Sequence, residues 1–161
     1  MSEKSNSINL NESAGLNKKR VSFHTLGCRL NFSETGSIAQ GFVDRGYEVV
    51  DFGAPSDVTF INTCTVTNEA DAKSRNTIRR FIRSNPSAVV VVVGCYSQVS
   101  ANEVAAIKGV DYIIGNHDKL NFLDYLEAVK PEIPVIVRER ISSEDFSIGF
   151  VGESGFDQRA N

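Results

Sequence analysis

Five consecutive valines, Val89 to Val93, constrain the fold more than any other feature of this sequence. A strand built only of apolar, β-branched residues has no face that suits water, so both of its faces must be covered. Such strands are typical of the centre of a parallel sheet that carries helices on both sides. The run therefore predicts an α/β fold with a doubly covered sheet.

Other short apolar runs alternate with stretches of helical spacing. Strands are expected at residues 21–25, 47–51, 57–62, 88–93 and 111–114, and helices at residues 33–45, 68–84, 100–108 and 118–130. Right-handed crossovers between successive strands then give a parallel sheet of about five strands. The predicted fold class is a Rossmann-like or flavodoxin-like three-layer sandwich.

Local signals support the ends of these helices. Ser33 is expected to cap the first helix, and Gly46 follows it where a positive φ is well tolerated. The second helix is expected to open on the capping residue Asn68 and to stop before Asn85-Pro86. The last helix is expected from an apolar stripe made of Leu120, Leu123, Leu126 and Val129.

Composition divides the chain into one domain and two polar ends. Residues 1–20 are expected to be a flexible leader, residues 21–130 the domain, and residues 131–161 an edge segment and linker, in which 134–137 could add a strand. The 17 Lys and Arg against 20 Asp and Glu give no general field that attracts a polyanion. No apolar run approaches a membrane span and no secretory signal opens the chain, so a cytoplasmic protein without a membrane partner is expected.

The three cysteines, Cys28, Cys64 and Cys95, each follow a different predicted strand. Because carboxyl ends of parallel strands meet at one edge of the sheet, the thiols are expected to converge there. A lone cysteine usually packs as a small hydrophobe, but three beside predicted helix starts favour a shared metal or redox site. Their odd number argues against a disulfide framework.

Two kinds of metal suit three thiolates: an iron-sulfur cluster, and zinc with water or a histidine as fourth ligand. His24 is near Cys28 in sequence but is expected to be packed or solvated, and His117 is expected at the surface. The sequence contains no GxGxxG, no P-loop and no CxxC, so nucleotide binding and thioredoxin-like exchange are not indicated. Positive charges crowd residues 73–83, where a solvated helix face is the simpler explanation than RNA contact.

The segments TLGCRLNFSET, INTCTVTNEADAKSRNTIRR and VVGCYSQ resemble the N-terminal domain of the radical-SAM methylthiotransferases that act on tRNA and ribosomal protein. The resemblance implies that Cys28, Cys64 and Cys95 ligate an auxiliary 4Fe-4S cluster with one open iron. It also implies an adjoining radical-SAM domain with S-adenosylmethionine and a second 4Fe-4S cluster on CxxxCxxC. That motif is absent from this sequence, so we expect no catalytic residue here and no activity from this chain alone.

Within that family, NTCTVT together with KSRNTIRR is most similar to the threonylcarbamoyladenosine branch. The resemblance implies that the intact enzyme adds a methylthio group to C2 of this adenosine beside the tRNA anticodon, using a sulfur donor. Nucleic-acid binding by this chain itself is expected to be weak or absent, because its charge is slightly negative. A thiol redox module and a zinc-binding module without catalytic role remain as alternatives.

Overall fold

The computed structural model describes residues 17–65, 67–124, 126 and 130–138. Its strands are β1 (Arg20–Thr25), β2 (Glu48–Val50), β3 (Val58–Thr63), β4 (Val89–Gly94), β5 (Tyr112–Ile114) and β6 (Val135–Val137). Its helices are α1 (Arg29–Asp44), α2 (Asn68–Ser84), α3 (Cys95–Val99) and α4 (Ala101–Ala105), with a 3-10 turn η1 (Phe122–Asp124). None of the helices in these ranges is long and apolar enough to cross a membrane.

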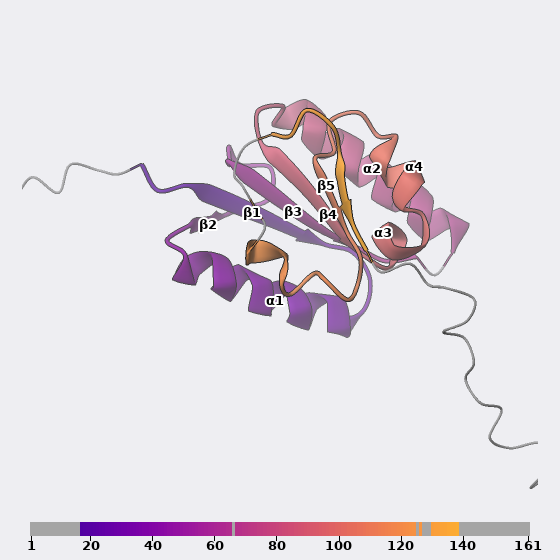
Figure 1. The fold of residues 1–161 in the computed structure, drawn as a ribbon, viewed down its shortest axis with the longest axis horizontal. Coiled ribbons are helices and arrows are strands. Elements are labelled where there is room, and N and C mark those ends of the chain that lie inside the picture. Colours follow the sequence, from indigo (N-terminus) through magenta and orange to yellow (C-terminus); the bar gives the residue numbers. More distant parts are fainter. Residues whose placement is uncertain (1–16, 66, 125, 127–129, 139–161) are drawn as a thin grey trace, which may run out of the picture.

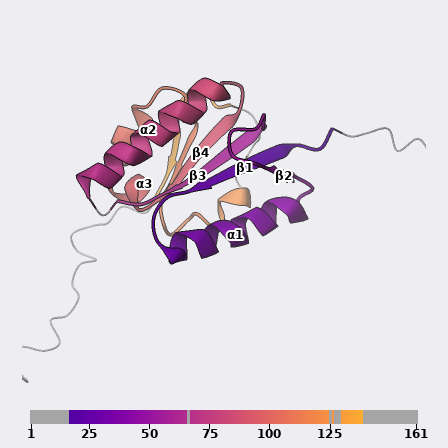
Figure 2. The ribbon, with the colours of Figure 1, turned by 180° about the vertical axis from the view of Figure 1, so that it is seen from behind.

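The strands form one six-stranded sheet in the order β2-β1-β3-β4-β5-β6, and every neighbouring pair is parallel. Helix α1 and the turn η1 lie on one face of the sheet, and α2, α3 and α4 lie on the other (Figures 1 and 2). The structure thus confirms the three-layer α/β prediction. The sheet has one strand more than the expected five, because β6 adds to its edge within the predicted segment 134–137.

The valine run occupies β4, and all six residues of this strand are buried. Val90 and Val92 belong to the core cluster under α2 and α4, together with Ile78 and Phe81. Val89, Val91 and Val93 belong to the cluster on the opposite face, which also contains Phe42 of α1. Because alternate side chains point to opposite faces of a strand, this run explains why both faces of β4 are covered.

The N-caps of two helices differ from the expectation. Helix α1 begins at Arg29, and its N-cap is Cys28 rather than Ser33, with no side-chain hydrogen bond at the cap. Helix α2 spans Asn68–Ser84 as expected, but its N-cap is Thr67, whose hydroxyl accepts a hydrogen bond from the backbone N–H of Ala70 at 3.1 Å. In both cases the N-cap precedes the residue that was expected to cap the helix.

The last two predicted helices are also revised. The region predicted as residues 100–108 contains α4, and the short α3 before it was not expected. The helix predicted at residues 118–130 is wrong where the structure describes it, since only η1 is helical there and Leu120 is 55% exposed. Leu123 and Leu126 still pack against the core. Val129, most of the predicted leader and residues 139–161 lie outside the described residues.

Candidate functional site

The three cysteines follow three neighbouring strands at the carboxyl edge of the sheet. Cys28 comes after β1 and caps α1, Cys64 comes directly after β3, and Cys95 is the first residue of α3 after β4. Strands β1, β3 and β4 are adjacent in the sheet, and the strand order reverses between β1 and β3. This is the position where open α/β sheets place their ligands.

All three thiols are free, and none is a core side chain. Cys28 is exposed, while Cys64 and Cys95 are half-buried. A small buried hydrophobe would be covered on all sides, so packing does not account for these cysteines. Three accessible thiols at one edge of the sheet can instead bind a ligand or react with one another.

Gly27 brings the β1–α1 loop into direct contact with Cys64. A Cβ atom at Gly27 would lie 2.6 Å from Cys64 Cβ and 3.2 Å from Cys64 Sγ, and the backbone φ of +116° is one that only glycine adopts easily. Burial raises the pKa of the Cys64 thiol, and the nearby thiols of Cys95 and Cys28 raise the pKa further. The thiols of Cys28 and Cys95 therefore lie within electrostatic range of Cys64.

The start of α1 favours the deprotonated form of Cys28. The backbone N–H groups of Asn31 and then Leu30, in the first turn of α1, lower the pKa of the Cys28 thiol. Unpaired N–H groups at a helix start favour negative charge in this way. The buried Asn31 side chain also fixes the loop, because its amide donates to the carbonyl oxygen of Leu26 at 2.9 Å.

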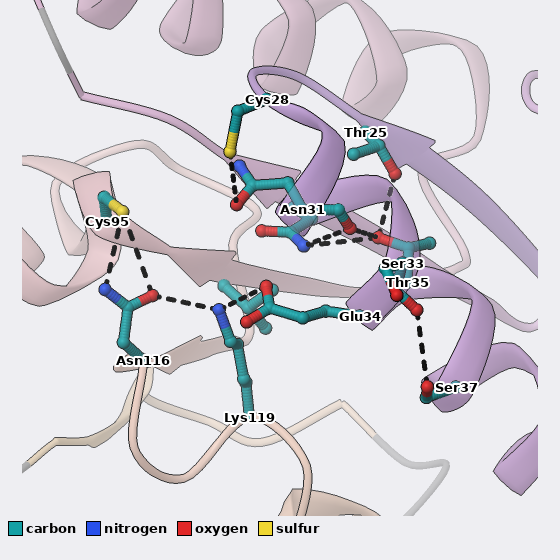
Figure 3. A network of polar contacts seen from close by, with 12 residues as sticks. Thr25, Cys28, Asn31, Ser33, Glu34, Thr35, Ser37, Cys95, Asn116 and Lys119 are labelled. Atoms are coloured by element: carbon teal, nitrogen blue, oxygen red, sulfur yellow. Dashed lines mark hydrogen bonds and ion pairs between the residues drawn. The ribbon is translucent and has the colours of Figure 1, made fainter.

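Cys95 is held by the elements that follow it. Tyr96 is fully buried, and its hydroxyl contacts Arg75 Nη1 at 2.9 Å and Glu103 Oε2 at 3.0 Å. These contacts anchor α3 at its first turn, immediately beside Cys95. On the other side, the Nδ2 atom of Asn116 lies 3.4 Å from the Cys95 sulfur (Figure 3).

Asn116 belongs to a polar network that the sequence did not suggest. Its Oδ1 atom lies 3.2 Å from Lys119 Nζ, and Lys119 forms an ion pair of 2.6 Å with Glu34 of α1 (Figure 3). Lys119 and Glu34 are 85 residues apart in the chain. No local spacing or motif could have revealed this contact.

A cavity of about 330 Å³ opens beside Cys64. Its walls come from the β1–α1 loop, from Cys64 and from one side of α2, and the charged group among them is Lys73. The lining residues are Leu26, Gly27, Cys64, Ala70, Lys73 and Ser74.

The two histidines take the places expected for them. His24 is half-buried and stacks on Phe52, with ring centroids 4.3 Å apart. Burial, then the charges of Lys73 and Arg80, lower the pKa of His24. His117 is exposed.

The donor set can be compared with the two kinds of metal site. Among the described residues, no group of three or more His, Cys, Asp and Glu side chains is arranged around a point that could hold one metal ion. Iron-sulfur clusters are held by cysteine thiolates. Three free thiols on adjacent strands, one of them with a lowered pKa, supply donors of this kind. The chemistry of these donors, three thiols, suits an iron-sulfur cluster.

Comparison with known proteins agrees with the motifs. Residues 20–115 match the family described as "Uncharacterized protein family UPF0004". The chain is 51% identical over 112 residues to "Threonylcarbamoyladenosine tRNA methylthiotransferase MtaB" of Bacillus subtilis (strain 168), which covers 70% of this chain and 25% of that protein. It is 47% identical over 108 residues to the protein of the same name from Aquifex aeolicus (strain VF5), covering 67% of this chain and 26% of that protein.

More distant matches carry other names. A "tRNA-2-methylthio-N(6)-dimethylallyladenosine synthase" of Syntrophus aciditrophicus (strain SB) is 26% identical over 147 residues, covering 86% of this chain and 32% of that protein. Among solved structures, a response regulator from Burkholderia pseudomallei superposes with a TM-score of 0.49 at 17% identity, covering 72% of this chain and 68% of that chain.

The chain spans about a quarter of the length of the first two relatives. The family match includes all three cysteines and strands β1 to β5. The match extends over more than half of the chain, so the chain belongs to the UPF0004 family, and its resemblance to the N-terminal domain of the methylthiotransferases is confirmed.

Proposed function

We propose that this chain is the iron-sulfur-binding domain of a tRNA methylthiotransferase, and that Cys28, Cys64 and Cys95 are the three protein ligands of a 4Fe-4S cluster. The observation that carries the proposal is the convergence of the three free thiols at the carboxyl ends of β1, β3 and β4. When bound, such a cluster supplies one iron without a protein ligand, at which a sulfur donor can bind.

The chain's own residues have separate tasks in this proposal. The start of α1 lowers the pKa of the Cys28 thiol, and Gly27 allows the loop to approach Cys64 closely. Tyr96 fixes the first turn of α3 and so the position of Cys95. The cavity beside Cys64, with Lys73 in its wall, gives a small anionic sulfur donor a place next to the thiols.

The proposal also includes the substrate of the intact enzyme. Two relatives with about half of the aligned residues identical are named threonylcarbamoyladenosine tRNA methylthiotransferases. We therefore assign this chain to an enzyme that places a methylthio group on C2 of threonylcarbamoyladenosine in tRNA. S-adenosylmethionine and the second 4Fe-4S cluster belong, in this proposal, to a radical-SAM domain outside these 161 residues.

Anaerobic reconstitution of the chain with iron and sulfide tests the metal assignment. We expect about four irons per chain and the absorption and EPR spectra of a cubane. Binding of one zinc without uptake of iron would support the zinc-module alternative. Reversible formation of a disulfide, again without uptake of iron, would support a thiol redox module.

A complementation assay tests the substrate assignment. A hybrid enzyme that carries this domain in place of the matching region of the Bacillus subtilis relative should restore the methylthio modification of threonylcarbamoyladenosine in tRNA. Mass spectrometry of digested tRNA measures the product. A hybrid that is folded and holds its clusters but modifies only another adenosine would contradict the assigned branch.

A further inference from the structure

The loop after β5 holds Asn116 beside Cys95. Strands β4 and β5 are neighbours, so the residues that follow them meet at the same edge of the sheet. The backbone N–H of Asn116 donates to Gln98 Oε1 of α3 at 3.1 Å, and the N–H of Gly115 donates to the carbonyl oxygen of Val137 at 2.8 Å. The backbone of Asn116 is thus fixed by the helix that Cys95 begins and by β6.

The side chain of Asn116 has only one orientation that satisfies its neighbours. An ammonium group donates hydrogen bonds and accepts none, so Lys119 Nζ must face the Oδ1 atom, at 3.2 Å. The Nδ2 atom then faces Cys95 Sγ at 3.4 Å, while Oδ1 is 4.0 Å from that sulfur. A thiolate can only accept a hydrogen bond, so the contact becomes an N–H···S bond once Cys95 is a ligand.

Lys119 is fixed in turn by Glu34. The ion pair measures 2.6 Å, and the side chains of Lys119 and Glu34 are only 7% and 18% exposed. A buried lysine that retains its partner cannot turn away from the amide without losing charge-assisted hydrogen bonds. Asn116 itself is exposed, so water could satisfy its amide. Burial therefore does not explain why Nδ2 faces the sulfur.

We propose that Asn116 is a positioning residue for Cys95, and that its N–H···S hydrogen bond, oriented by Lys119 and Glu34, raises the reduction potential of the cluster that Cys95 ligates. The inference rests on the proposed function. The physical reason is that reduction adds negative charge, part of which resides on the ligand sulfurs, and a hydrogen bond to sulfur stabilises the reduced state more than the oxidised state.

The test is the reduction potential of the reconstituted cluster in wild-type protein and in three variants. Asn116→Ala removes the N–H donor without changing charge, and its potential should be more negative than that of wild type. Asn116→Asp keeps the shape of the side chain and the contact with Lys119 but replaces the donor with an acceptor, so its potential should be lower still. The matched control is Asn121→Asp, which adds the same charge at an exposed position of the same loop.

The outcomes separate this inference from the proposed function. If wild type takes up no cubane, the proposed function fails. If wild type holds a cubane and Asn116→Ala has the wild-type potential, the inference is overturned and the proposed function stands. Loss of the cluster from both Asn116 variants would also overturn it, because Asn116 would then be needed for assembly. Asn116→Asp keeps the contact with Lys119, so its unfolding temperature should not fall below that of wild type, whereas a merely structural role of the amide would lower it.

Discussion

Replacing Gly94 with alanine should strongly destabilise the fold. Gly94 ends β4 and caps α3, with φ +102° and ψ −165°, a region that residues with a Cβ atom scarcely populate. A Cβ atom there would overlap the carbonyl oxygen of Thr63 and lie 2.7 Å from Asn62 Oδ1. Thr63 and Gly94 are paired across β3 and β4, so relief of the overlap requires two central strands to separate.

The expected cost follows from two contributions. Backbone strain in this region costs about 2 kcal/mol, and forcing a carbon atom against fixed backbone costs about 2 kcal/mol more. A decrease of about 4 kcal/mol in the free energy of unfolding lowers the unfolding temperature of a domain of this size by about 15 °C. Since Cys95 follows Gly94 directly, the variant should also bind less iron on reconstitution.

Two other glycines supply matched controls. Gly46 has φ +85°, but a Cβ atom added to it would meet no other atom within 4 Å, so Gly46→Ala should show only backbone strain, about 1 kcal/mol. Gly36 lies inside α1, and a Cβ atom added to it would meet no other atom within 4 Å. Gly36→Ala should therefore raise the free energy of unfolding by about 0.5 to 1 kcal/mol. Thermal unfolding followed by circular dichroism measures the series. An unfolding temperature for Gly94→Ala close to that of Gly46→Ala would refute the steric argument.

Further predictions concern ligands, pH and RNA. Replacing any one of the three cysteines with alanine should abolish stable cubane uptake, measured as iron content, while an Ala variant with full iron would exclude that cysteine as a ligand. His24 has a lowered pKa in the fold, so the unfolded chain binds more protons and stability should fall as pH drops through about 6.5. Urea unfolding of His24→Phe should show a smaller change than wild type over that range, and parallel curves would contradict the assignment. The chain, with a formal charge of −3, should bind tRNA weakly in a filter or anisotropy assay, and tight, salt-sensitive binding would show that the basic side of α2 is an RNA surface.

The central strands could be predicted from the sequence because they are buried and rich in β-branched residues. All residues of β3, β4 and β5 are buried, and the signal is strongest in β4, which contains five valines in a row. The helix predicted at residues 118–130 is wrong because the stripe of leucines does not face the core as a unit. Leu120 is exposed, whereas its polar neighbour Lys119 is buried. The ion pair between Lys119 and Glu34 fixes this segment, and a pairing over that distance leaves no periodic trace.

The first turn of α1 was missed for a related reason. Leu30 and Phe32 are 64% and 59% exposed, so the apolar residues at the start of α1 do not mark its inward face. The cap is Cys28, a residue without a capping side-chain bond, whereas Ser33 carries the usual capping chemistry. Periodicity and capping therefore both pointed to a later start.

The positions of the cysteines in the candidate site follow from the sheet topology, whereas the contacts of each thiol follow from side-chain packing. Cys28, Cys64 and Cys95 could be placed at one edge because each follows a parallel strand, and the carboxyl ends of parallel strands coincide. Which neighbours contact each thiol could not be derived. Asn116 reaches Cys95 from a loop 21 residues later in the chain, and this contact depends on the pairing of β4 with β5.

The fold should persist without a cluster, because the core and the cysteines are physically separate. Within the described residues, the two core clusters lie on the two faces of the sheet and contain no cysteine. Burial of one large side chain such as Phe42 or Phe81 contributes about 2 kcal/mol. Removing one sulfur from a half-exposed cysteine costs about 1 kcal/mol or less, a small part of the 5 to 15 kcal/mol, roughly, by which domains are stable. Unlike a zinc finger, whose folding free energy comes from its metal, this domain should therefore show a cooperative thermal transition in its metal-free form, and a metal-free chain without one would contradict the separation of core and site.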